Sequence, residues 1–168
     1  MSQQPLLTLP SPERWPTWES WEDWCTTTAP PGVERIEPPT IHRGRRARRS
    51  GEAPADLRGV VDGVPVLVEV KHHSNSRNRS WPLDNTAWKP HQKRAMRKAA
   101  SGGAVVGLLL CYYGSPLWLP WDALSQALWD WATADGPGSL SPEWLQLHAR
   151  PIDPAAGWWA AASNSMAR

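Results

Sequence analysis

The residues of this sequence whose types and spacing best suit chemistry are Asp56, Glu69 and Lys71. Glu69 and Lys71 are two positions apart in a run of alternating valines. Because successive side chains of a strand take opposite faces, we expect both on the same face. Two carboxylates beside an ammonium suit a hard divalent cation such as Mg²⁺, which binds oxygen ligands and usually keeps several waters.

A hairpin is predicted to bring these groups together. Segments 57–61 and 64–70 have strand character and flank Asp62 and Gly63, a strong signal for a two-residue turn. Folding back at this turn places Asp56 close to Glu69 at one edge of a sheet. The competing interpretation is that Glu69 and Lys71 are solvated residues on the outer face of an edge strand, since so short a pattern often arises by chance.

A helix before the hairpin offers a further acid. The Ser-Pro-Glu sequence at 11–13 predicts a helix start, and the helix should run to about residue 26. Glu19 and Glu22 flank its tryptophan-rich stripe. Either both are ordinary solvated acids, or one of them leans over the edge of the core to join Asp56 and Glu69.

Basic residues gather in segments that are candidates for binding phosphate. Segment 42–51 has five arginines and no apolar periodicity, which predicts a solvated, mobile loop between two strands; such a density of arginine favours phosphate binding. A helix starting at Pro90 and stopped by Gly102 and Gly103 presents a second basic face, and two more arginines follow Lys71. The candidate DNA-binding residues are Arg43, Arg45, Arg46, Arg48, Arg49, Arg77, Arg79, Lys93, Arg94, Arg97 and Lys98.

The remaining pattern predicts an α/β fold with a mixed central β-sheet flanked by helices. Residues 104–113 form a continuous apolar run typical of a buried central strand. A short strand at 118–120, a helix at 121–132 and a last short helix from Pro142 follow. We expect a loose tail at 1–10, one domain from 11 to 150 with the basic loop at about 42–51, and a C-terminal tail from 151 to 168.

Composition narrows the class of protein. Thirteen Trp and no Phe indicate that Trp fills the bulky core positions, and the net charge of +2 says little about partners. Cys25 and Cys111 are interpreted as buried free thiols, and His72 and His73 lack the second ligand pair that zinc requires. With no leader and no apolar run near the roughly 20 residues of a membrane helix, we expect no membrane contact and a cytoplasmic location in a bacterial cell or phage-infected host.

From about residue 33 to residue 124 the sequence resembles the RecU type of Holliday junction resolvase, within the PD-(D/E)xK nuclease superfamily. The spacing of Asp56, Glu69 and Lys71 has the form of the superfamily signature. The matched stretches keep one order along the chain: Glu37-Pro38-Pro39, Ala55-Asp56, Gly63-Val64-Pro65, Val68-Glu69-Val70-Lys71, Trp81-Pro82-Leu83-Asp84-Asn85, His91-Gln92 and Gly102-Gly103 before the buried strand.

The resemblance implies a restriction-endonuclease-like core and a set of site residues. Asp56, Glu69 and the backbone carbonyl of Val70 would bind the metal, and Lys71 would position or activate the attacking water. A helix acid completes such sites, with Glu22 the first choice and Glu19 the second. The implied activity is Mg²⁺-dependent cleavage of branched DNA, above all four-way junctions, with Mn²⁺ as the alternative ion.

Because a resolvase must cut two matching strands with two equivalent sites, a homodimer is expected. Two other functions stay open at this point. The chain is then either another nuclease of the same fold, of the nicking, repair or restriction type, or a DNA-binding protein without catalytic activity in which the basic segments bind phosphates.

Overall fold

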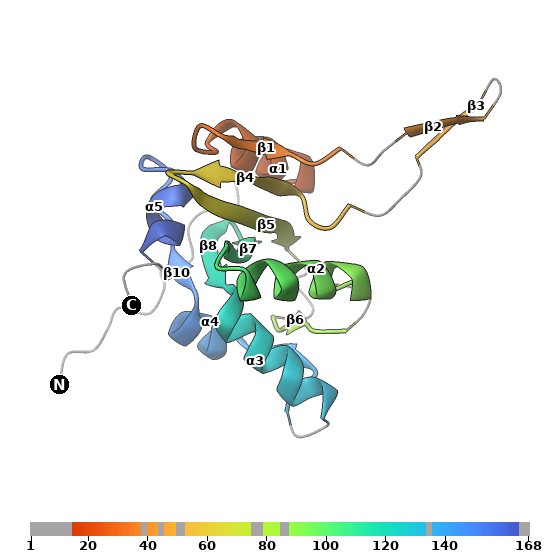
Figure 1. The fold of residues 1–168 in the computed structure, drawn as a ribbon. Coiled ribbons are helices and arrows are strands. Elements are labelled where there is room, and N and C mark those ends of the chain that lie inside the picture. Colours follow the sequence, from red (N-terminus) through yellow and green to blue (C-terminus); the bar gives the residue numbers. More distant parts are fainter. Residues whose placement is uncertain are drawn as a thin grey trace.

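The centre of the molecule is a six-stranded sheet (Figure 1). The computed structural model describes residues 15–37, 40–43, 46–49, 53–74, 79–84, 88–133 and 136–164. In spatial order the strands are β1 (Val33–Arg35), β4 (Leu57–Val61), β5 (Val64–His73), β7 (Val105–Tyr112), β8 (Ser115–Pro120) and β10 (Arg150–Pro151). Strands β5 and β7 pair in parallel and the other neighbours pair antiparallel, so the sheet is mixed.

The β4–β5 hairpin forms where the sequence predicts it. Asp62 and Gly63 have φ angles of 50° and 79°, the left-handed values that a tight two-residue hairpin turn needs at both positions. Leu57 pairs with Val68 at the open end of the hairpin. Strand β5 continues beyond its predicted end at residue 70, because β7 offers a parallel partner as far as His73. The C-terminal part of β5 therefore extends beyond Leu57, the first residue of β4.

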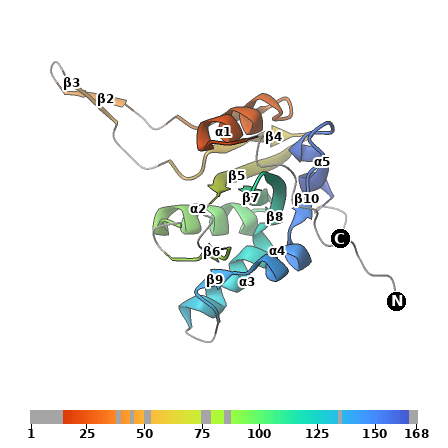
Figure 2. The same ribbon diagram turned by 180° about the vertical axis from the view of Figure 1, so that it is seen from behind.

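Alternate side chains of β5 enter two separate cores. Val66, Val68 and Val70 pack in one core with α1 (Trp18–Thr27) and α5 (Trp158–Ser163). Leu67 borders the other core, to which α2 (Pro90–Ser101), α3 (Trp121–Ala132) and α4 (Pro142–His148) contribute. The two views in Figures 1 and 2 show these helices on both sides of the sheet. The prediction of a mixed central sheet flanked by helices is thus confirmed.

Helix α1 begins later than the sequence pattern indicates. The predicted cap at 11–13 lies outside the described residues, but residues 15–17 are not helical. Instead the side chain of Thr17 accepts a 3.2 Å hydrogen bond from the backbone N–H of Ser20, and the hydroxyl of Ser20 donates back to the carbonyl of Thr17 at 2.8 Å. This reciprocal cap starts the helix at Trp18.

The described part of the basic segment forms a hairpin, where the sequence predicted a loop without strands of its own. Strands β2 (Thr40–Arg43) and β3 (Arg46–Arg49) pair antiparallel. Figures 1 and 2 both draw this hairpin away from the central sheet. Glycine is favoured in two-residue hairpin connections, so Gly44 is a hairpin signal within the arginine-rich segment.

The predicted C-terminal tail is also wrong over most of its length. Residues 150–151 add the edge strand β10 to β8, and α5 packs into the core. Trp158 is fully buried, and its indole N–H donates a 2.9 Å hydrogen bond to the carbonyl of Cys25. Its ring stacks on Trp118 with centroids 6.3 Å apart. The largest anchor of this segment is one tryptophan, and the few other buried residues, Ile152 and Ala162, leave little periodicity in the sequence.

Other predicted elements agree with the structure. Helices α2, α3 and α4 start at Pro90, Trp121 and Pro142 as expected, and every residue of β7 is buried. A two-stranded sheet of β6 (Trp81–Pro82) and β9 (Ser139–Leu140) was not predicted by any pattern. Cys25 and Cys111 are buried free thiols, as predicted. No helix in the described part of the chain is long and apolar enough to cross a membrane.

Candidate active site

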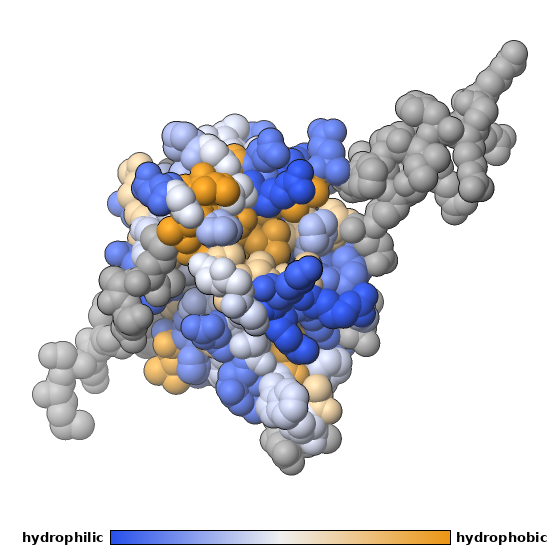
Figure 3. Space-filling view, viewed as in Figure 1, coloured by the Kyte–Doolittle hydropathy of each residue, from blue (hydrophilic) through white to orange (hydrophobic). Residues whose placement is uncertain are grey.

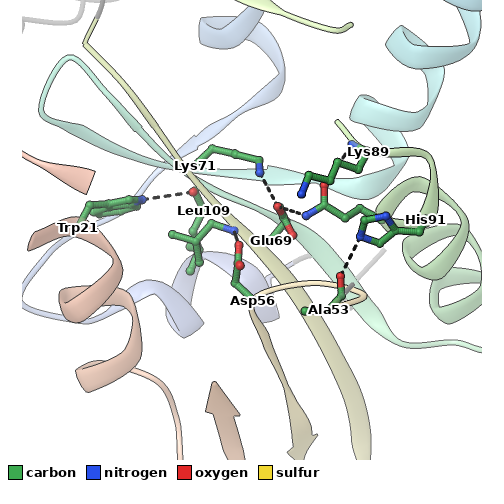
Figure 4. A network of polar contacts seen from close by, with 10 residues as sticks. Trp21, Ala53, Asp56, Glu69, Lys71, Lys89, His91 and Leu109 are labelled. Carbon is green, nitrogen blue, oxygen red and sulfur yellow. Dashed lines mark hydrogen bonds and ion pairs between the residues drawn. The ribbon is translucent and has the colours of Figure 1, made fainter. Parts of the chain in front are cut away.

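Glu69 is a fully buried acid on an interior strand. Its side chain projects toward the α2 side of β5, where Oε1 accepts hydrogen bonds from Nζ of Lys71 at 2.5 Å and from Nε2 of Gln92 at 2.6 Å (Figure 4). Strand β5 is flanked by β4 and β7. The interpretation of Glu69 as a solvated residue on an edge strand is therefore wrong. Glu69 and Lys71 share a face of β5, as predicted, and are in contact there.

Asp56 is fixed directly before the first residue of β4. Its backbone N–H donates to the carbonyl of Val68 at 3.1 Å, and its carbonyl accepts from the N–H of Ile36 at 2.8 Å. Its side-chain Oδ2 accepts from the N–H of Val70 at 2.8 Å (Figure 4). The N–H and C=O of one residue point to the same side of a strand. The carbonyl of Val70 therefore lies on the same side of β5 as Asp56.

Burial disfavours ionisation of both carboxyl groups. Burial raises the pKa of Glu69 to about 7, and the charge of Asp56 adds to the rise, while Lys71 and Gln92 oppose it. Burial likewise raises the pKa of Asp56, against the N–H of Val70 and the charge of Lys71. A cation bound between the two groups would favour their charged forms, because an opposite charge nearby stabilises a carboxylate.

The donor set fits a hard divalent cation. Oε2 of Glu69 is buried and accepts no hydrogen bond from any described residue. Together with Asp56 and the carbonyl of Val70 it presents oxygen ligands only, as Mg²⁺ and Mn²⁺ prefer. Within the described ranges, no group of three or more His, Cys, Asp or Glu side chains is arranged to hold a metal. The fit therefore rests on the two carboxylates and the carbonyl.

Lys71 supplies the positive charge of the site. Its side chain is 24% exposed, so the ammonium reaches the surface while its partner Glu69 stays buried. Nζ also lies 5.9 Å from the ring centroid of Trp88, which is fully buried. The ion pair and the aromatic ring together hold the ammonium beside Glu69.

Of the two helix acids, Glu22 is the one coupled to the site. The Glu22 side chain is 15% exposed, and its Oε1 lies 2.9 Å from Nη2 of Arg35. Burial raises the pKa of Glu22, Arg35 lowers it, and the charge of Asp56 raises it again. Glu19 is exposed. The order of preference, Glu22 before Glu19, agrees with this arrangement.

Gln92 is a site residue to which the sequence pattern alone assigned no role. Its Oε1 accepts a 3.2 Å hydrogen bond from the N–H of Lys89, while its Nε2 donates to Glu69. The sequence feature that points to Gln92 is its place at the third position of α2, where glutamine is typical of a helix cap. His91 beside it contacts the carbonyl of Ala53 at 3.1 Å through Nε2, which ties the segment before Asp56 to α2 (Figure 4).

The predicted DNA-binding residues differ in the solvent exposure of their side chains. Figure 3 shows strongly hydrophilic side chains over α2, where Arg94, Arg97 and Lys98 are exposed. Lys93 does not belong to that open face, because it is half-buried with Nζ 5.0 Å from the ring centroid of Trp131. Arg79 is exposed. Arg45 and Arg77 lie outside the described residues, and Arg43, Arg46, Arg48 and Arg49 lie in β2 and β3.

The site thus joins a buried and a half-buried carboxyl group, a lysine and a peptide carbonyl beside the start of β4, with exposed arginines on the neighbouring helix. No protein-family model matches the chain, and no curated protein sequence matches it. Its side chains and their surroundings are the basis for assigning a function.

Proposed function

We propose that this protein is a divalent-metal-dependent endodeoxyribonuclease with a restriction-endonuclease-like core, which resolves four-way DNA junctions. The observation that carries the proposal is the burial of Glu69 with one carboxylate oxygen that no described residue satisfies. The attraction of a partner charge often does not repay the cost of removing a carboxylate from water, so stability alone is a poor explanation for the buried Glu69. Buried acids with perturbed pKa values beside a charged partner are characteristic of functional sites.

Each site residue has a defined part in phosphodiester hydrolysis. Asp56, Glu69 and the carbonyl of Val70 would hold Mg²⁺ or Mn²⁺. Such an ion, when bound, activates a water and neutralises charge on the phosphate oxygens. Lys71 places an ammonium beside the developing negative charge, and this requires no proton transfer. Gln92 keeps the carboxylate of Glu69 in one orientation through its hydrogen bond.

Phosphate contacts would provide the affinity for DNA. Arginine pairs bidentately with phosphate oxygens, and the β2–β3 segment and the exposed face of α2 supply arginines from two separate parts of the chain. Contacts of this kind position a duplex without reading its sequence. The preference for four-way junctions rests on the resemblance to the RecU type of resolvase, and the homodimer follows from the need for two matching cuts.

The test compares cleavage of a synthetic four-way junction with cleavage of a linear duplex of the same sequence, in Mg²⁺, in Mn²⁺ and in excess chelator. We expect paired cuts in the junction that require the metal and little cutting of the linear duplex. Equal cutting of both substrates would instead favour a nicking, repair or restriction nuclease of the same fold. Metal-independent binding without any cutting would favour a non-catalytic DNA-binding protein.

A further inference from the structure

Arg35 stands at the border of the candidate site. It is the last residue of the edge strand β1, and the N–H of the next residue, Ile36, donates to the carbonyl of Asp56 at 2.8 Å. Its Nη2 lies 2.9 Å from Oε1 of Glu22, with the Arg35 side chain 54% exposed and that of Glu22 15% exposed. The Glu22 end of this ion pair is therefore largely buried, whereas the Arg35 end is open to solvent.

The charge of Arg35 acts on two acids of the site. It lowers the pKa of Glu22, and it also lowers the pKa of Asp56. A second ion pair, between strands β4 and β1, provides a comparison: Nη2 of Arg58 lies 3.9 Å from Oε1 of Glu34, with both side chains more than half exposed. Arg35 is thus placed to counter the negative charge of the site, whereas Arg58 pairs with an exposed acid.

We propose that Arg35 is an internal counter-ion for Glu22 which a divalent cation must displace, and that the released guanidinium then binds a DNA phosphate. This inference rests on the proposed function. A carboxylate oxygen in a 2.9 Å contact with a guanidinium is not free to coordinate a metal, and two cations in one acidic site repel each other. Because Arg35 is half exposed, leaving Glu22 costs it little, and its planar fork of donors suits a phosphate.

Metal binding and DNA binding are then coupled through one side chain. Without metal, Arg35 is occupied by Glu22 and contributes little to binding DNA. With metal, its charge becomes available beside the scissile phosphate. Two ligands coupled in this way strengthen each other's binding by the same factor, so the coupling is measurable from either side.

The first measurement is Mn²⁺ binding without DNA, by calorimetric titration at pH 8 and fixed ionic strength. We expect Arg35→Gln to bind Mn²⁺ about two- to fivefold more tightly than wild type, the range that an ion pair of this exposure supports. Arg58→Gln, which removes the same charge from the neighbouring strand, should bind as wild type does. The gain should disappear when Glu22→Gln is combined with Arg35→Gln.

The second measurement is junction binding in Ca²⁺, used as a probe ion, and in chelator. Ca²⁺ should strengthen binding by wild type and by Arg58→Gln more than by Arg35→Gln. Equal Mn²⁺ affinity in wild type and Arg35→Gln, or an equal gain in Arg58→Gln, would overturn the counter-ion role while leaving the proposed nuclease intact. If Asp56→Asn binds Mn²⁺ as well as wild type does, the metal site itself is wrong and both proposals fail.

Discussion

The side-chain amide of Gln92 donates a 2.6 Å hydrogen bond to Oε1 of Glu69, across 23 residues of sequence. The other end of the same amide accepts from the N–H of Lys89 at the start of α2. One side chain therefore caps the basic helix and orients the buried acid of the central strand. The position of α2, which carries the exposed arginines, is therefore fixed relative to Glu69.

Replacing Gln92 should impair the site more than the fold. Gln92→Met keeps the volume but removes the hydrogen bond to Glu69, and we expect metal affinity or cleavage rate to fall by about 10- to 100-fold. Gln126→Met on α3 is the matched control, because that exposed glutamine donates a 2.8 Å hydrogen bond to Asp130 of its own helix. A Gln92→Met protein that cuts junctions at the wild-type rate would remove Gln92 from the site.

Three substitutions test the assignment of the central residues. Asp56→Asn and Glu69→Gln each remove a metal ligand, so cleavage should fall to background while junction binding stays equal or tightens. Lys71→Ala should slow cleavage by about 100- to 1,000-fold with little change in metal affinity, since it removes a charge that acts on the transition state. Single-turnover cleavage and calorimetric titration separate these effects. Wild-type rates in either acid variant would contradict the metal site.

The stability of the metal-free protein should depend on pH through Glu69. Its pKa rises from the ordinary 4.5 to about 7 on folding, so the folded state binds this proton more tightly than the unfolded state. The resulting stabilisation is complete below pH 4.5 and is lost as the pH rises to about 7.

Glu69→Gln cannot ionise, so it should match wild type near pH 4 and unfold at a temperature higher by several degrees at pH 8. Thermal unfolding in chelator measures this difference. Asp23→Asn, at an exposed position of α1, should show no such gain. A Glu69→Gln protein that is less stable than wild type at pH 8 would show that the charge of Glu69 stabilises the fold.

The two helix acids should differ in their effect on cleavage. Glu22→Gln should lower the rate by about tenfold or more at unchanged DNA affinity, because the carboxylate coupled to Asp56 is lost. Glu19→Gln, on the exposed side of the same helix, should have little effect. The reverse order of effects would move the third acid of the site to the preceding turn of α1.

The two basic surfaces are separated by the salt dependence of junction binding. Removing one arginine that binds a phosphate should reduce the slope of log affinity against log salt by roughly 0.9. If the β2–β3 hairpin holds the junction, replacing Arg45, Arg46, Arg48 and Arg49 by Ala should flatten the slope by about two to four units. The parallel variant replaces three exposed residues of α2 by Ala: Arg94, Arg97 and Lys98. A wild-type slope in the hairpin variant, with a flattened one in the helix variant, would place the DNA on α2.

Local pattern in the sequence was sufficient for several elements that build the site. The alternation of residues 64–70 predicts that Glu69 and Lys71 share a face, and Asp62 with Gly63 predicts the turn that returns Asp56 to them. The Pro90 start and the Gly102 stop bound α2. These features depend on side-chain period and on backbone angles of neighbouring residues, which a short stretch of sequence determines by itself.

Tertiary structure alone decided how those residues are used. Burial of Glu69 depends on β7 pairing with β5 and on α2 covering that face, neither of which any local pattern specifies. The contacts of Gln92 with Glu69 and of Arg35 with Glu22 join separate elements of the chain, and α5 is held in the core by Trp158 and Ala162. Such contacts leave no periodic signal, because they depend on which surfaces meet when the sheet and its helices pack together.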